Sequence, residues 1–214
     1  MTVFQKTFDG SIDSKIEWNK VGICKRKGDL HMDKVGIVYG RFQIPHLKLI
    51  EYILAAKMRC TKLYIGITFP DDLYVSEEEG LNYRVKRNAN PLTYVERYEM
   101  IRDSLLEFKV PRDAFEIIPF PIDRPNYLSQ YIPKDAVCYV GICDEWTAKN
   151  ERLFQHFGIK TEVLWTREAK DKGVTGSIIR QKIQNKEDWR LLVPKSVYKY
   201  MIENEIDERI RKMK

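Results

Sequence analysis

Short apolar runs alternate with amphipathic helical patterns along most of this 214-residue chain, and this alternation restricts its fold more than any other feature. The apolar runs predict strands at 34–40, 62–67, 115–120, 136–141 and 160–165. Helical patterns lie between these runs at 47–57, 93–108 and 145–157, and again from Gly176 to the C-terminus. Strands that are separated by helices form parallel crossovers. We therefore expect an α/β fold with a doubly wound, Rossmann-like parallel sheet of about five strands and a helical C-terminal tail.

Residues 1–31 do not follow this alternation. They contain weak strand signals and a basic run, Lys25-Arg26-Lys27, and the α/β pattern begins abruptly at Met32. We predict that 1–31 is an appendage, either a native extension or an added leader sequence. A Rossmann-like domain is expected over 32–184, with a C-terminal helical segment, 185–214, packed on the same domain.

Charge and composition narrow the possible partners. The chain has 37 Lys and Arg against 31 Asp and Glu, a net charge of +6 that suits phosphate anions but is small for a nucleic-acid surface. A DNA-binding role for the basic N-terminus and C-terminal helices is a minor alternative. No run approaches the ~18 apolar residues of a membrane span, and no secretion signal is evident. The four cysteines lack metal-ligand spacing. We expect a cytoplasmic protein with reduced thiols, no protein-held metal, and neither nucleic-acid nor membrane partners.

The turn that follows the first predicted strand carries candidate phosphate-binding groups. In open α/β sheets, ligands bind outside the carboxyl ends of the strands, at the point where the strand order reverses. Gly40 permits a tight exit from the strand, and Arg41 offers a planar guanidinium to phosphate oxygens. His46 directly precedes a helix N-terminus, where main-chain amides favour anions.

Two further segments are expected at the same edge of the sheet. In Val174–Arg180, Gly176 gives access to the backbone, the Ser177 hydroxyl can bind phosphate, and Arg180 lies one turn further along the helix. In the other segment, Asn90-Pro91-Leu92-Thr93 leads into a helix that begins with a capping box formed by Thr93 and Glu96.

Four motifs together resemble the HxGH-type nucleotidyltransferase superfamily, and the likeness is strongest to archaeal-type nicotinamide-mononucleotide adenylyltransferases. The motifs keep the family's order over about Met32 to Met201 and read GRFQIPHLKL, NPLTYVER, VTGSIIR and WRLLVPKSV. The resemblance implies transfer of AMP, or CMP, from a nucleoside triphosphate to a small phosphorylated acceptor, with release of pyrophosphate. It implies ATP, with CTP as the variant, nicotinamide mononucleotide as the leading acceptor, and Mg²⁺ as cofactor. Members of such families are often homo-oligomers, so self-association is left open.

The resemblance also assigns roles to residues of this chain, position by position. The implied catalytic residues are His46, Lys48 and Arg180. The implied nucleotide-binding residues are Gly40, Arg41, Phe42, Gly141, Thr175, Gly176 and Ser177. The implied acceptor-binding residues are Asn90, Arg97, Asp123 and Asp144, and no residue is implied to bind a metal.

The chain departs from the family pattern inside the first motif. Lys48 and Leu49 stand where the family has Gly and the second His, and Lys48 could replace the lost phosphate donor as a point charge. Two alternatives to nicotinamide mononucleotide adenylylation follow: a catalytically weakened nucleotide-binding module, and a transferase that acts on a different phosphate or phosphonate acceptor. The long polar loop 71–90 is a further unusual feature. Its Arg84, Lys86 and Arg87 could close over a phosphate.

Overall fold

The computed structural model describes residues 17–18, 24–25, 32–70, 89–168 and 173–213. By its contacts the chain divides into two units, Met1–Met32 and Asp33–Lys214. In the first unit, β1 (Glu17–Trp18) pairs antiparallel with β2 (Cys24–Lys25). The predicted phosphate contacts of Arg84, Lys86 and Arg87 lie outside the described residues.

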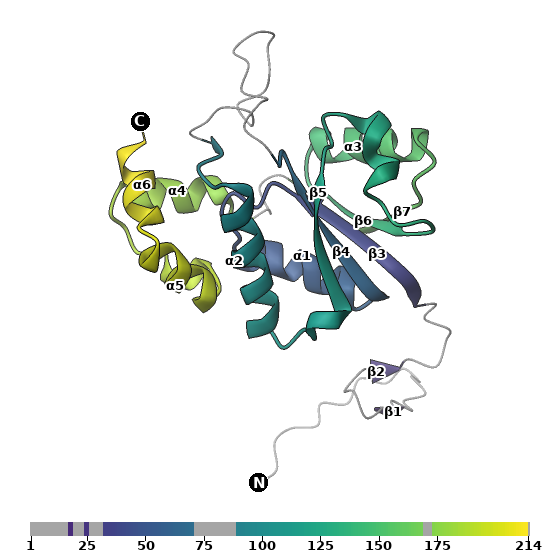
Figure 1. The fold of residues 1–214 in the computed structure, drawn as a ribbon, viewed down its shortest axis with the longest axis horizontal. Helices are drawn as coiled ribbons and strands as arrows, with labels where there is room; N and C mark the ends of the chain where they lie inside the picture. The colour runs from purple at the N-terminus through teal and green to yellow at the C-terminus, as the bar shows by residue number, and fades with distance from the viewer. Residues whose placement is uncertain (1–16, 19–23, 26–31, 71–88, 169–172, 214) are drawn as a thin grey trace, which may run out of the picture. The chain divides into compact units, whose positions relative to one another are not determined.

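The second unit contains the five-stranded parallel sheet that the sequence predicts, which confirms the fold class (Figure 1). Its strands, each within two residues of the predicted bounds, are β3 (Asp33–Gly40), β4 (Cys60–Thr68), β5 (Phe115–Phe120), β6 (Val137–Ile142) and β7 (Thr161–Thr166). Their order across the sheet is β5-β4-β3-β6-β7, and every neighbouring pair is parallel. The order reverses between β3 and β6, so the carboxyl end of β3 is the expected ligand-binding edge.

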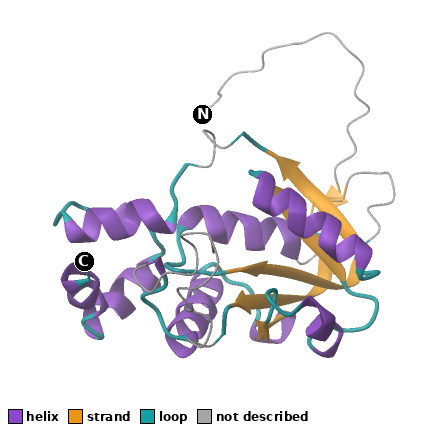
Figure 2. Ribbon diagram, turned by 90° about the horizontal axis from the view of Figure 1, so that it is seen from above, coloured by secondary structure: helices purple, strands orange, loops and turns teal. Residues whose placement is uncertain are grey.

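Helices cover both faces of this sheet (Figure 2). Residues alternate between the faces with the period of two that strands require: Val38 packs with α1 (Leu47–Lys57) and α2 (Tyr94–Glu107), whereas Ile37 and Tyr39 pack on the opposite face. That opposite face is covered by α3 (Glu145–His156) and the 3-10 helix η4 (Pro125–Gln130). A short 3-10 helix, η3 (Arg112–Ala114), leads into β5.

The C-terminal helical pattern is divided into separate helices. These are α4 (Gly176–Gln184), the 3-10 helix η6 (Arg190–Leu192), α5 (Lys195–Glu203) and α6 (Ile206–Lys212). Lys186 and Glu205 adopt left-handed backbone conformations at the breaks, and Pro194 caps the start of α5. None of the described helices combines the length and apolar character that crossing a membrane requires.

The C-terminal helices form a second hydrophobic core, separate from the two that flank the sheet. Its tail residues include Trp189, Val193, Val197, Met201, Ile206 and Ile210. Ile44 from the first motif and Leu92 from the NPLT segment also belong to it. Figure 1 shows α4, α5 and α6 grouped beside α2. The tail is therefore packed against the segments that carry the candidate site.

Candidate active site

The two central strands β3 and β4 end beside each other, and both chain exits adopt left-handed backbone conformations. Gly40 of β3 lies opposite Ile67 of β4, and Phe42 and Phe69 have φ values of 50° and 49°. Such a conformation costs a non-glycine residue about 1–2 kcal/mol, so the surrounding contacts must stabilise it. The left-handed turn occurs at Phe42 rather than at Gly40.

Packing explains both residues at the exit from β3. A Cβ at Gly40 would lie 3.1 Å from the ring of Phe42, so the absence of a side chain lets that ring fold back onto the strand. The Phe42 ring is 1% exposed and belongs to the core under α1 and α2. The predicted nucleotide contact of Phe42 can therefore come only from its main chain.

Arg97 clamps these two exits from the first turn of α2. It is 2% exposed and donates hydrogen bonds to four main-chain carbonyls, those of Arg41, Thr68, Phe69 and Thr93, at 2.8–3.1 Å. The sequence predicted an acceptor-binding residue here. The guanidinium bonds the backbone, because an arginine on the inward face of α2 meets the carbonyls at the ends of β3 and β4, and its acceptor-binding role stays a prediction.

Gln43 joins three segments that are far apart in the sequence, and sequence analysis did not single it out. Its side-chain amide donates from Nε2 to Leu92 O at 3.1 Å and accepts the Leu92 amide hydrogen through Oε1 at 2.9 Å. Its main-chain oxygen accepts from Arg180 Nη1 at 2.5 Å. We call this group, Gln43 with Leu92, Gly176 and Arg180, the Gln43 junction.

The start of α4 approaches the first motif closely at this junction. A Cβ on Gly176 would lie 2.3 Å from Gln43 O and 3.2 Å from Ile44 N, so only glycine fits. Arg180 is 8% exposed and also donates to Ser177 Oγ at 3.0 Å, while Thr175 caps the helix through the Ile178 amide. The structure thus brings together the two segments that were predicted to bind phosphate, and it gives Gly176 a packing role as well.

The NPLT segment reaches the first motif through side chains too. Arg41 Nη1 lies 3.4 Å from Asn90 Oδ1, next to the junction between Gln43 and Leu92. Thr93 and Glu96 form the predicted capping box at the start of α2. Residues of all three predicted segments therefore meet at the carboxyl end of β3.

His46 caps α1, and its environment fixes its protonation. Its Nδ1 accepts the Leu49 amide hydrogen at 3.3 Å, and the side chain is 7% exposed. Burial lowers the pKa of His46 to about 4, so the imidazole is neutral at pH 7. With Nδ1 acting as acceptor, the ring proton of the neutral form lies on Nε2. His46 can therefore offer an uncharged N–H donor.

The helix ends at this edge differ electrostatically from the other described helices. No acidic residue lies in the first turn of α1 or α4. In the remaining described α-helices a carboxylate does lie at the N-terminus: Glu96 in α2, Asp144 and Glu145 at α3, Glu107 against the first amides of α5, and Asp207 and Glu208 in α6. The partial positive charge of α1 and α4 is thus left for another anion.

The substituted positions of the first motif lie on the surface of α1. Lys48 Nζ is 2.6 Å from Glu51 Oε2, and Glu51 also pairs with Arg167 at 2.8 Å. The alkyl chain of Lys48 lies beside Gly173, just before α4. Its predicted role as a replacement phosphate donor stays a prediction, and it would require the ammonium group to exchange Glu51 for phosphate.

Two residues predicted near the ligand have structural contacts. Gly141 lies inside β6, and a Cβ there would be 2.9 Å from Trp165 Nε1 of the neighbouring strand. Asp144 caps α3, where its Oδ1 accepts the Thr147 amide hydrogen at 2.8 Å in a reciprocal capping box. Aspartate is a common helix cap, and the acceptor-binding role of Asp144 stays a prediction.

Asp123 follows the end of β5 and is the predicted acceptor residue that keeps hydrogen-bonding capacity. Both of its carboxylate oxygens are buried, and within the described part of the chain neither has a hydrogen-bond partner. Arg124 Nε lies 3.5 Å from Oδ2 and forms an ion pair with it. Buried carboxylates without hydrogen bonds are costly, so Asp123 is suited to accept from donors on a ligand.

A Rossmann-like parallel sheet that gathers arginines, a neutral histidine and two helix N-termini at one edge has the groups that a phosphate-binding enzyme needs. The chain belongs to the HxGH-type nucleotidyltransferase superfamily, as its relatives show. It is 41% identical to phosphonoformate cytidylyltransferase of Streptomyces viridochromogenes over 176 residues, 82% of this chain and 95% of that protein. It is 32% identical to nicotinamide-nucleotide adenylyltransferase of Saccharolobus solfataricus over 188 residues, 83% of this chain and 95% of that protein.

A solved structure agrees with the fold. The bifunctional NMN adenylyltransferase/ADP ribose pyrophosphatase of Francisella tularensis, complexed with AMP and a manganese ion, matches with a TM-score of 0.58 and 16% identity. The match covers 84% of this chain and 52% of that one, so the chain spans about half the length of the bifunctional protein. No family model matches the sequence.

Proposed function

We propose that this nucleotidyltransferase transfers a cytidylyl group from CTP to a phosphonate oxygen of a small acceptor, with phosphonoformate as the leading candidate. The observation that carries this choice is the 41% identity to phosphonoformate cytidylyltransferase, which exceeds the 32% identity to the adenylyltransferase. It replaces nicotinamide mononucleotide as the leading acceptor expected from the sequence.

The proposed reaction is a direct in-line displacement. An acceptor oxygen attacks the α-phosphorus of the triphosphate, a new P–O bond forms, the bond between the α-phosphorus and the bridging oxygen breaks, and pyrophosphate leaves. Negative charge develops on the leaving pyrophosphate, so donors fixed beside it lower the barrier. Arg41 and Arg180 supply positive charge there, and His46 supplies the Nε2–H donor.

The two helix N-termini complete this environment. The first amides of α1 and α4 face an edge where neither helix has a carboxylate in its first turn. Ser177, exposed at the start of α4, adds a hydroxyl. Because these groups are held by the backbone, little reorganisation is needed when charge develops.

We propose Mg²⁺ as the metal, bound by the triphosphate and water. Among the described residues, no group of three or more His, Cys, Asp or Glu side chains could hold a metal ion. These residues therefore do not fit a protein-held metal centre, and none of them is assigned to Mg²⁺.

A second candidate, adenylyl transfer from ATP to nicotinamide mononucleotide, is favoured by Asp123. A carboxamide on the acceptor could donate to the buried Asp123 oxygens that lack hydrogen bonds in the described structure. Phosphonoformate has no such donor, and its own carboxylate would be repelled by Asp123 at short range. Asp123 therefore distinguishes the two acceptors. A nucleotide-binding module without turnover, suggested by Lys48 and Leu49, is the third possibility.

The experiment is pyrophosphate release by the purified protein with Mg²⁺, for CTP and ATP each combined with phosphonoformate and nicotinamide mononucleotide. The proposal expects the CTP and phosphonoformate pair to give the highest kcat/KM. A highest value for ATP with nicotinamide mononucleotide would establish the second candidate. Tight CTP binding in calorimetry without any turnover would establish the third.

The variant Asp123→Asn sharpens this test. For phosphonoformate we expect KM to stay the same or fall, because a repulsive charge is removed. For nicotinamide mononucleotide we expect KM to rise, because a charged acceptor becomes a neutral amide. Asp113→Asn, an exposed position in η3 before β5, is the matched control and should change neither KM.

A further inference from the structure

Gln43 is the residue at which the three site segments are tied together. It is 5% exposed, although it carries neither charge nor an apolar side chain. Its side chain satisfies both main-chain groups of Leu92, and its own carbonyl accepts from Arg180. Every one of these bonds joins residues at least 49 positions apart in the sequence.

The segment 90–93, which Gln43 holds through Leu92, is also held by two arginines. Arg209 donates to Pro91 O at 3.0 Å, and Arg97 donates to Thr93 O at 3.1 Å. Leu92 lies between these two anchors, and Gln43 bonds both its amide and its carbonyl. Asn90 at the start of the turn contacts Arg41. A shift of Gln43 would therefore move the 90–92 turn and, through Asn90, the Arg41 side chain.

The main chain of Gln43 contacts α4. Its carbonyl is held by the Arg180 guanidinium, and the Gly176 backbone packs directly against it. Phe42, in its left-handed conformation, turns the chain so that residues 42 and 43 enter different environments. Gln43 therefore joins the two arginines that the proposed reaction uses, through its side chain toward Leu92 and the Arg41–Asn90 contact and through its main-chain carbonyl toward Arg180.

We propose that Gln43 is a positioning residue for nucleotidyl transfer, one that fixes the Arg41–Asn90 contact and Arg180 relative to each other. This role rests on the proposed function for its catalytic effect, whereas the coupling of the two segments stands on the geometry. Misplacement of reacting groups by about 1 Å can cost roughly 100-fold in rate. Loss of the Gln43 side-chain bonds should therefore lower kcat more than it changes either KM.

Two substitutions separate this role from a general loss of stability. Gln43→Met keeps the length of the side chain and removes both hydrogen bonds to Leu92 at every pH. Gln43→Glu restores both bonds only when the introduced carboxyl is protonated, since a carboxylic acid donates through its hydroxyl and accepts through its carbonyl. Burial raises the pKa of such a carboxyl, which brings its protonation toward the working pH range.

The measurement is kcat as a function of pH for both variants, each divided by the wild-type value at the same pH. We expect the Gln43→Met ratio to stay near one hundredth throughout, and the Gln43→Glu ratio to rise toward one as the pH falls. Tyr139→Phe is the control, because it removes a buried hydroxyl that bonds Asp33 at the opposite end of the strands. It should reduce stability and leave the ratio near one. A Gln43→Met ratio near one, or two flat profiles, would overturn the proposal.

Hydrogen exchange provides a readout that needs no substrate. In Gln43→Met, the Leu92 amide and the 177–180 amides should both exchange faster than in wild type, and Tyr139→Phe should accelerate neither. Acceleration at Leu92 alone would show that the segments are not coupled and would overturn the proposal. If Gln43→Met does not fold, Gln43→Glu is compared with wild type at low and at high pH, since its two bonds to Leu92 are lost only when the carboxyl is ionised, and the same two outcomes decide. If Gln43→Met accelerates exchange at both segments but the wild-type protein shows no turnover, the proposed function is contradicted and the coupling still holds.

Discussion

His46 accepts the Leu49 amide hydrogen through Nδ1 at 3.3 Å, so the imidazole caps α1 and keeps Nε2 as its donor. The residue that provides this amide occupies the position of the second histidine in the family motif. The remaining histidine is therefore oriented by the backbone at the substituted position, whatever side chain that position carries.

The two functions of His46 can be separated by substitution. His46→Asn keeps a good helix cap, so its free energy of unfolding should stay within about 0.5 kcal/mol of wild type. Its kcat should fall about 100- to 1000-fold, because a donor to the leaving group is lost. His46→Ala should lose the same activity and about 1 kcal/mol of stability as well. Denaturant unfolding and pyrophosphate release check both expectations. Equal stability of the two variants would contradict the capping role.

The burial of His46 predicts how stability depends on pH. The folded-state pKa is lowered to about 4, while the ordinary value is 6.5, so between these values the unfolded chain binds a proton that the folded chain does not. Stability from this group is complete above pH 6.5 and falls as the pH decreases toward 4. The full loss is about 3 kcal/mol, since each pKa unit corresponds to about 1.4 kcal/mol.

The measurement is the free energy of unfolding of wild type minus that of His46→Asn across this range. The subtraction removes the contribution of carboxylates, which titrate in both proteins. We expect the difference to decrease as the pH falls from 6.5 and to level off below 4. A difference that is constant with pH would show that the imidazole is not protected from protonation.

Arg97→Lys should behave as a structural variant. Lysine has a single ammonium group and cannot reach four carbonyls that a guanidinium bridges, so we expect a loss of about 3 kcal/mol in stability. The variant's kcat should fall because the exits of β3 and β4 shift. A rise in acceptor KM with unchanged stability would instead restore the acceptor-binding role that the sequence suggested.

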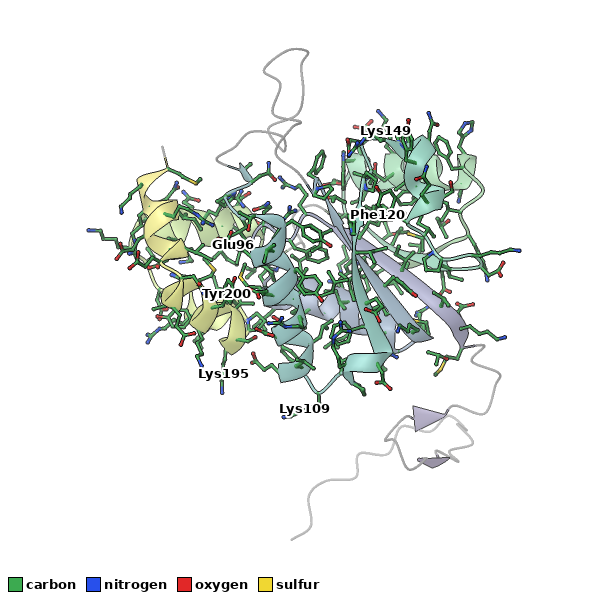
Figure 3. The ribbon with its side chains drawn as sticks, viewed as in Figure 1. Glu96, Lys109, Phe120, Lys149, Lys195 and Tyr200 are labelled. Atoms are coloured by element: carbon green, nitrogen blue, oxygen red, sulfur yellow. The ribbon has the colours of Figure 1, made fainter. Side chains whose placement is uncertain are left out.

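The ion pair between Glu96 and Arg209 links the C-terminal tail to the site. Arg209 contacts both carboxylate oxygens, at 2.7 and 2.8 Å, and Figure 3 shows Glu96 and Tyr200 between α2 and the C-terminal helices. Burial favours a higher pKa for Glu96, but the hydrogen bonds from Arg209 and Thr93 outweigh it and lower that pKa.

A double-mutant cycle with Glu96→Gln and Arg209→Met should give a coupling energy of about 1 kcal/mol in unfolding experiments. Arg209→Met should also lower kcat, because the Pro91 carbonyl loses its partner. Lys199→Met removes a charge from an exposed ion pair on α5 and serves as the control. It should change neither kcat nor the coupling energy between Glu96 and Arg209. Additive effects of the two substitutions would contradict the link.

The sheet could be predicted from the sequence because its signals are local. Strand periodicity, the capping box of Thr93 and Glu96, and the order of the motifs each depend on residues near one another in the chain, and the structure confirms them. The bonds at Gln43 depend on residues 49 and 137 positions away, which no local pattern encodes. The four carbonyl contacts of Arg97 were not foreseen either, because helical spacing does not reveal whether a first-turn arginine faces solvent or backbone. Gln43 was passed over because an uncharged amide gives no chemical signal of its own.

Phe42 and Ile44 are two residues apart, yet one belongs to the core of the sheet and the other to the core of the C-terminal helices. Regions with separate cores can lose order at separate free energies. Damage to the last thirty residues, by a nick or an inherited substitution, would then disorder the wall of the site while the sheet remains folded. Such a protein would keep its sheet and lose the edge at which its chemistry takes place.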